Sequence, residues 1–208
     1  MPIDLPALVA PGHTALVTQE CQRGVIGDHS MLPALAEAAA AGGIAVRIGA
    51  LARAARAVDI PVLHGVFHRR TDGRGANHNA RLFMGTQRGG RSDVMVAGSP
   101  SAEVVPEIGM DESDFVVPRY HGLSPMAGTS LDAILRNLDV TTIVGVGVSV
   151  NVAMTNFAFD AVNAGYQFVL PRDAVAGTPA EYVDAVLQNT LAYVATVTTA
   201  DEVIAAWS

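Results

Sequence analysis

Short runs of β-branched and other apolar residues alternate along the chain with Ala-rich stretches of helical composition. Several runs are apolar at consecutive positions rather than alternating ones, which is typical of parallel strands covered on both faces. The pattern therefore predicts an α/β fold, a three-layer sandwich in which helices flank a six-stranded parallel sheet. The six runs are TALVTQE (14–20), IPVLHGVF (60–67), DFVVP (114–118), TTIVGVG (141–147), YQFVL (166–170) and ATVTT (195–199).

Residues with known capping preferences mark several helix ends. The segments 178–181 (TPAE) and 199–202 (TADE) have the spacing of a capping box, the first with Pro179 at the first helical position. Gly165 stands where a helix is expected to stop. We find no internal repeat and no shift in composition, so residues 1–208 are expected to form one domain.

Composition limits the classes of partner. All 13 basic residues are Arg, and 20 acidic residues outnumber them to give a net charge of -7, which argues against a general nucleic-acid or anionic-membrane surface. The start, MPIDLPALVAPGH, lacks a basic region followed by an apolar core, and no later apolar run has the length of a membrane span. We therefore expect a soluble cytoplasmic protein. The single cysteine, Cys21, rules out an internal disulfide and a multi-thiolate metal site.

The Gly- and Arg-rich stretch between Phe67 and Pro100 has no clear period, which is unusual inside a compact domain. Two interpretations stay open: a solvated loop, or an electropositive lid whose guanidinium groups bind a small anion. Residues 64–91 contain one acid, Asp72, and six arginines: Arg69, Arg70, Arg74, Arg81, Arg88 and Arg91.

Polar side chains follow the predicted strands at their carboxyl ends, where open parallel sheets bind ligands. Glu20 directly follows a buried run, so its carboxyl should be partly desolvated, with a raised pKa unless Arg119 lies close. An isolated polar residue at such a place is usually a solvated loop residue or a helix cap, but convergence of several favours a site. The other polar residues at strand ends are His64, His68, Arg69, Arg70, Arg119, Tyr120, His121, Ser149, Asn151, Arg172 and Asp173.

A metal site is not expected. His64 and His68 are four residues apart, but on a strand-to-loop segment rather than on a helix, and no third ligand follows at a suitable distance. We therefore expect neither a metal nor another cofactor.

With these residues placed, the chain resembles the isochorismatase-like hydrolase family, which includes nicotinamidases, N-carbamoylsarcosine amidohydrolases and isochorismatases. The likeness runs from about Ala15 to Asp173 and implies the family's Rossmann-like sheet. ALVTQECQRGVIG is similar to the opening strand, with Glu20 and Gln22 at the positions of the family's acid, usually Asp, and its Gln. VVPRYHGLSPMAGTSLDAILRNLDVTTIVGVGVSVNVAMTNFAFDAVNAGYQFVLPRDA carries the most specific part of the likeness.

The resemblance also shows where this chain departs from the family. Arg119 takes the place of the catalytic Lys, and Ala153 that of the nucleophilic Cys, so all three members of the Asp-Lys-Cys triad are replaced. A cis peptide at Val148-Ser149 is implied as well. The nicotinamidase branch binds a metal through an acid and histidines after the second strand, but HGVFHRRTDGRGANHN does not reproduce that pattern.

Ala153 has no lone pair and no ionisable group, so acyl transfer through a thioester there is impossible. Cys21 is expected to point away from the face that Glu20 takes, because strand side chains alternate. Three explanations follow. First, the chain resembles the isochorismatase branch, which carries a small residue at this position and hydrolyses a vinyl ether with the strand-one acid and water. Second, the chain is a ligand-binding or scaffolding relative without catalysis. Third, Ala153 replaces the Cys of a cysteine amidohydrolase.

The first explanation gives the working hypothesis: a hydrolase that acts on a small, anionic metabolite, with Glu20 as acid/base, Arg119 beside it and Ala153 at the nucleophile position. A homodimer or larger homo-oligomer is expected, because family members commonly assemble and the Ala- and Gly-rich stretch 36–46 permits close packing. Nucleic acid and membrane are not expected as partners. The substrate-binding candidates are Gln22, His64, Arg69, Arg81, Tyr120, Ser149 and Asn151.

Overall fold

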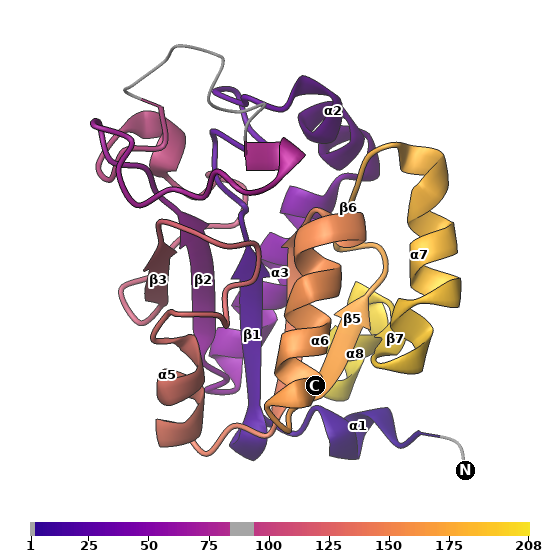
Figure 1. The fold of residues 1–208 in the computed structure, drawn as a ribbon. Helices are drawn as coiled ribbons and strands as arrows, with labels where there is room; N and C mark the ends of the chain where they lie inside the picture. Colours follow the sequence, from indigo (N-terminus) through magenta and orange to yellow (C-terminus); the bar gives the residue numbers. More distant parts are fainter. Residues whose placement is uncertain (1–2, 84–93) are drawn as a thin grey trace.

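A parallel β-sheet forms the centre of the molecule (Figure 1). In this computed structural model, which describes residues 3–83 and 94–208, the strand order is β3-β2-β1-β4-β5-β7. The predicted α/β fold and its six strands are confirmed to within two residues at each end, and the sheet contains one more strand, β6, which pairs with β4. Two residues are too few to give a recognisable apolar run, so β6 was missed. The strands are β1 (Thr14–Gln19), β2 (Val62–Phe67), β3 (Phe115–Arg119), β4 (Thr142–Val148), β5 (Gln167–Pro171), β6 (Val175–Ala176) and β7 (Thr196–Thr198).

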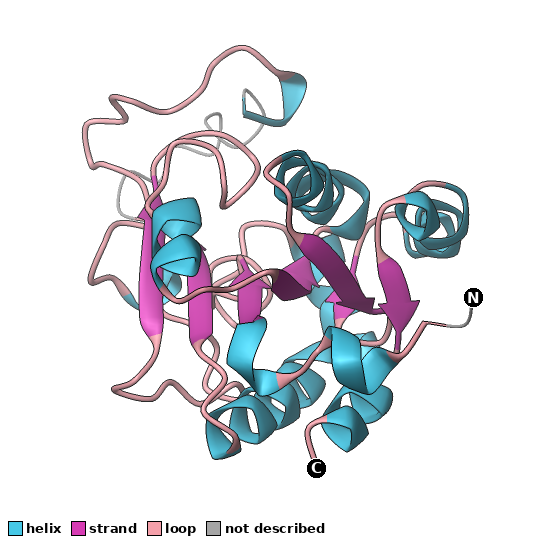
Figure 2. Ribbon diagram, turned by 90° about the horizontal axis from the view of Figure 1, so that it is seen from below, coloured by secondary structure: helices cyan, strands magenta, loops and turns pink. Residues whose placement is uncertain are grey.

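Helices cover both faces of the sheet, so that the molecule has three layers (Figure 2). Leu16 of β1 belongs to the core cluster on one face of the sheet, which also contains buried residues of α2 (Pro33–Gly42), α3 (Ile44–Ala57) and α8 (Ala200–Ala206). Its neighbours Ala15 and Val17 pack on the opposite face. Successive side chains of a strand point to opposite faces, so burial on both faces explains the continuous apolar run. The second face is covered by α5 (Leu131–Asn137), α6 (Thr155–Asn163) and α7 (Val183–Asn189), while the short α1 (Leu5–Leu8) packs beside α8.

The predicted helix signals differ in outcome. Thr199 and Glu202 form the capping box at the start of α8, and Gly165, with φ 95°, follows the end of α6 as expected. The capping box predicted at Thr178 is wrong. Pro179 is extended (ψ 149°), and the helical turn begins after it, at Ala180. The carbonyl of Thr178 instead accepts a hydrogen bond from Asn151 at 3.0 Å, which holds this segment to the turn after β4.

Gly43 separates α2 from α3 and has φ 62°, in the left-handed region that glycine adopts without a steric penalty. The two helices are bent by 60° at this residue. Within the described residues, no single helix is long and apolar enough to cross a membrane, and this bent pair passes that test only when both helices are counted together.

The carboxyl ends of the strands lie at the top of Figure 1, where the loops after β2 and the start of α2 gather. Crossover connections between parallel strands return to the amino end, so all strand-end residues meet at one edge. This edge carries the candidate site.

Candidate active site at the carboxyl ends of the strands

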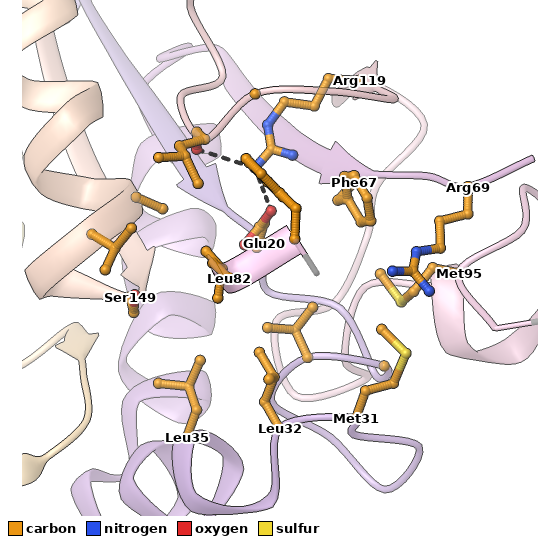
Figure 3. Close-up of a pocket in the computed structure, with 17 residues that line it drawn as sticks. Glu20, Met31, Leu32, Leu35, Phe67, Arg69, Leu82, Met95, Arg119 and Ser149 are labelled. Atoms are coloured by element: carbon orange, nitrogen blue, oxygen red, sulfur yellow. Dashed lines mark hydrogen bonds and ion pairs between the residues drawn. The ribbon is translucent and has the colours of Figure 1, made fainter. Parts of the chain in front are cut away.

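A pocket opens at the carboxyl edge of β1, β2 and β3, next to the turn after β4 (Figure 3). Five of the residues expected to form the site line it, namely Glu20, Arg69, Arg119, Ser149 and Ala153. The predicted convergence of strand ends therefore takes place for these five. The remaining described lining residues are Gly24, Val25, Met31, Leu32, Leu35, Phe67, Leu82, Phe83, Met95, Gly122, Leu123 and Val152.

Glu20 and Arg119 form an ion pair in this pocket, with Arg119 Nη2 donating to Glu20 Oε1. Because β2 lies between β1 and β3, the arginine reaches across the last residue of β2, and its Cζ lies 5.4 Å from the centroid of the Phe67 ring. This distance is typical of a cation–π contact. The long Arg side chain thus bridges two strands that are not neighbours in the sheet.

The Glu20 side chain retains 20% of its accessible surface and that of Arg119 only 3%. Burial raises the pKa of the Glu20 carboxyl above its ordinary value, and the charge and hydrogen bond of Arg119 oppose that rise. Glu20 also has φ 50°, an uncommon conformation for a residue with a side chain, and one that clusters at functional sites. The backbone therefore leaves the strand geometry at the residue that carries the carboxyl.

The guanidinium of Arg119 has one donor group to spare. Nη2 also donates to the carbonyl of Leu123 at 3.1 Å, whereas the buried Nη1 has no hydrogen-bond partner in the part of the chain that the structure describes. Gln19 donates to the same Leu123 carbonyl at 3.1 Å. An unpaired buried donor on a charged group is costly unless a ligand or water accepts its hydrogen bond, so Nη1 is a ready contact for an oxygen acceptor.

Ala153 and Ser149 form the side of the pocket next to β4. The peptide bond Val148-Ser149 is cis, as the resemblance implied, and a single π-helical turn, Val150–Met154, follows and leads into α6. Such turns occur frequently at functional sites. The methyl group of Ala153 offers neither a nucleophile nor a hydrogen bond.

Cys21 does not replace the missing nucleophile. Its thiol lies in the core under α3, 1% exposed, and donates to the Gln19 carbonyl at 3.6 Å. Burial, followed by the nearby Glu20 charge, raises the pKa of Cys21 to about 12. Since it is the only cysteine of the chain, no thiolate is available for covalent catalysis in the pocket.

Gln22 and His64 were expected to bind substrate, but neither lines the pocket. The Gln22 amide accepts from Phe67 N at 2.7 Å and donates to the carbonyls of Phe67 and Ala102, at 3.0 and 2.9 Å. These hydrogen bonds tie the segment after β1 both to the end of β2 and to Ala102, the last residue of the 3-10 turn Pro100–Ala102. Sequence spacing places Gln22 near Glu20 but gives no sign of these partners.

His64 lies in the middle of a buried polar network. Its Nδ1 lies 2.9 Å from Thr18 Oγ1, and its Nε2 lies 3.1 Å from Asp114 Oδ2. Asp114 in turn accepts from Arg56 of α3 at 2.9 and 2.6 Å. The His64 side chain has no accessible surface, so this Thr-His-Asp arrangement joins strands and does not meet the pocket.

The other candidates lie around the pocket rather than in its described lining. Tyr120 is 41% exposed and its ring meets that of His68 edge to face, at 6.1 Å between centroids. Asn151 donates to Thr178, while its Oδ1 is buried without a partner among the described residues. Arg81 is exposed. Arg88 and Arg91 lie outside the described residues. Among the lid arginines that the structure describes, Arg69 lines the pocket.

No pattern in the sequence predicted the apolar part of the lining. Leu32 and Leu35 come from the start of α2, Met95 from the loop before β3, and Leu82 from the Arg-rich segment. Apolar side chains in loops read as ordinary core, and no periodicity distinguishes those that face a cavity.

Within residues 3–83 and 94–208, no three His, Cys, Asp or Glu side chains are grouped closely enough to hold a metal ion. Glu20, the one acid among the described lining residues, forms an ion pair with Arg119. The chemistry that the described side chains offer here is therefore proton transfer at a carboxyl and charge stabilisation by a guanidinium.

Known proteins share this parallel α/β fold. The model of the Isochorismatase domain family matches residues 14–202, and the chain belongs to this family of hydrolases. A cysteine hydrolase from Pseudomonas syringae pv. phaseolicola 1448A has a similar structure, with a TM-score of 0.82, 25% identity, and coverage of 96% of this chain and 94% of that one. The fold of N-carbamoylsarcosine amidase from Thermoplasma acidophilum is also similar, with a TM-score of 0.66, 23% identity, and coverage of 91% and 97%.

Among curated proteins, the uncharacterized isochorismatase family protein YwoC of Bacillus subtilis is 34% identical over 87 residues. That alignment covers 42% of this chain and 46% of YwoC, so the chain matches about half the length of this relative.

Proposed function

We propose that this chain hydrolyses a small, anionic metabolite without a cysteine nucleophile, using Glu20 as its acid and base. The observation that carries the proposal is the position of the Glu20 carboxyl in a pocket next to Ala153, where the family's nucleophile would stand. With Ala at position 153 and the thiol of Cys21 buried, no thiol is available, and in this proposal water is the nucleophile.

In the proposed reaction, protonated Glu20 gives its proton to the substrate, for example to the carbon of a vinyl ether. Water then adds to the resulting cation, and the Glu20 carboxylate takes the proton that this water loses. The adduct separates into a carbonyl compound and an alcohol, and the enzyme returns to its starting state. Arg119 holds the carboxyl in place through Nη2 and offers Nη1 to an oxygen of the substrate.

A second candidate, a ligand-binding relative without catalysis, is favoured by one observation. The guanidinium of Arg119 is permanently charged and touches Glu20, which favours the ionised carboxylate over the protonated acid. A binding protein needs only the shape and polarity of the pocket, whereas a hydrolase needs a carboxyl that exchanges protons.

The deciding experiment is a hydrolysis screen of vinyl ethers, amides and ureido acids, followed by comparison of the chain with Glu20→Gln. Glu20→Gln keeps the shape and removes the proton, so turnover should fall by about 10²- to 10⁴-fold. Glu37→Gln, at an exposed position of α2, is the matched control and should keep full activity. Full activity of Glu20→Gln would contradict the proposal. Loss of the activity of the unchanged chain when Cys21 is alkylated in the folded protein would contradict it as well. Binding of anions without any turnover would support the second candidate.

A further inference from the structure

The pocket has polar groups on one side and an apolar wall on the other. In Figure 3, Arg119 and Glu20 lie on one side, and Met31, Leu32 and Leu35 lie on the opposite side. Leu82 stands between them. None of these four apolar side chains can donate or accept a strong hydrogen bond. The polar lining residues Ser149 and Arg69 lie at the two ends of this wall, so the apolar surface that faces the ion pair is formed by Met31, Leu32 and Leu35.

The polar side also limits the charge that a ligand can bring to it. Glu20 and Arg119 neutralise each other, and Nη1 of Arg119 still lacks an acceptor. Arg69 adds a second guanidinium to the lining, beside Met95, so the described lining as a whole favours a single anionic group (Figure 3). One ligand oxygen satisfies this donor. The rest of the ligand then extends toward the leucine and methionine side chains.

We infer that the ligand of this pocket combines one oxygen-bearing group, a carboxylate or the carbonyl of its derivative, with a compact hydrocarbon body that carries no polar substituent. This inference rests on the proposed function only in taking the same pocket as the substrate site. Burial of the hydrocarbon against the wall is favourable, whereas a polar atom there loses its hydrogen bonds to water and gains none in return. The wall therefore favours an apolar body where the ligand meets Met31, Leu32 and Leu35, and Arg119 favours an oxygen at the other end.

Two probes of nearly equal shape test the inference: cyclohexanecarboxylate and oxane-4-carboxylate, in which a ring oxygen replaces the carbon farthest from the carboxylate. Their affinities for the full chain are measured by isothermal titration calorimetry. Cyclohexanecarboxylate is expected to bind about tenfold or more tightly than the oxane, because the ring oxygen is left without a partner. Equal affinities, or no binding of either probe at millimolar concentration, would overturn the inference.

Leu82→Gln tests the wall itself. Leu82 is 47% exposed, so the substitution leaves the core intact, and it places an amide where the hydrocarbon would lie. The preference for cyclohexanecarboxylate should shrink by about threefold or more, while Leu138→Gln, at a 37% exposed leucine after α5, should leave it unchanged. An unchanged preference in Leu82→Gln contradicts the role of this residue in the wall.

Arg119→Lys tests the polar side. The ammonium can still pair with Glu20 but cannot supply both amino groups, so both probes should weaken by a similar factor and keep their ratio. Weaker binding of the oxane alone would contradict the assignment of the carboxylate oxygen to Arg119.

The outcome is separable from that of the proposed function. Selective binding without turnover of the corresponding esters, amides or vinyl ethers supports the inference and contradicts hydrolysis. Turnover without a preference between the cyclohexane and the oxane ring supports hydrolysis and overturns the inference.

Discussion

Arg119 and Glu20 are 99 positions apart in the sequence and meet at the carboxyl edge of the sheet, where Arg119 Nη2 donates to the Glu20 carboxylate. The contact crosses over β2, whose last residue, Phe67, lies under the guanidinium. Arg119 thus controls the proton affinity of Glu20 and keeps a second amino group for a ligand. The predictions below test this pair and the groups that hold it.

Replacing Arg119 by Gln should raise the pKa of Glu20. Burial already raises this pKa, and the guanidinium opposes the rise, so its removal leaves burial unopposed. The carboxyl should then stay protonated to higher pH, and any acid-catalysed activity should extend to higher pH with it. The carboxyl ¹³C shift of Glu20 during a pH titration measures the change. Arg136→Gln, at an exposed position of α5, should leave the pKa of Glu20 unaltered. An unchanged or lowered pKa of Glu20 in Arg119→Gln would contradict the prediction.

Ala153→Cys should create a reactive thiol in the pocket. The native Cys21 is buried with a pKa of about 12, so the unchanged chain should resist iodoacetamide while folded. The variant should gain one alkylated site, identified by mass spectrometry. Ala161→Cys, on the buried face of α6, is the control that should stay unlabelled. Equal labelling of the two variants would show that position 153 is no more accessible than the core.

Gln22→Leu should destabilise the fold by about 2–4 kcal/mol, because the Phe67 amide and two carbonyls lose their partner. Urea unfolding followed by circular dichroism measures the change. Gln188→Leu, at an exposed position of α7, should change stability by less than about 0.5 kcal/mol. Weaker ligand binding by Gln22→Leu at unaltered stability would instead indicate direct contact with the ligand.

The buried His64 should make stability depend on pH. Burial lowers the pKa of His64, because desolvation outweighs the attraction of Asp114. The native state therefore holds His64 neutral, while the unfolded chain takes up a proton below about pH 6.5, so stability is full above that pH and falls below it. One proton corresponds to a slope of up to about 1.4 kcal/mol per pH unit.

His64→Asn should reduce this slope between pH 5 and 6.5, measured by urea unfolding at several pH values. His121→Asn, at an exposed residue, is the control and should keep the slope of the unchanged chain. An identical slope in both variants would assign the pH dependence to other groups.

Sedimentation at micromolar concentration should show a dimer or larger assembly of this chain. The Ala- and Gly-rich stretch 36–46 forms the end of α2 and the start of α3, and Val46 within it is 63% exposed. Val46→Glu should weaken association if this stretch lies at the interface. A monomer over the whole concentration range would refute the assembly itself.

The sequence alone determined the layers and the edge of the sheet that carries the site. Consecutive apolar residues such as Ala15, Leu16 and Val17 predict burial on both faces, because the period of a strand is two and both sets must be covered. The absence of a thiol at Ala153 is likewise a property of the sequence, since no fold can give a methyl group a lone pair.

Only the tertiary structure decided which polar residues meet in the pocket. Gln22 and His64 look like ligand-binding residues in the sequence, but their partners, Phe67, Thr18 and Asp114, come from other elements, and contact with these saturates both side chains. The apolar wall and the unpaired Nη1 of Arg119 are equally invisible before folding. The sequence determines which groups a side chain can donate or accept with. The capacity left to bind a ligand depends on which neighbours the fold brings within about 3 Å.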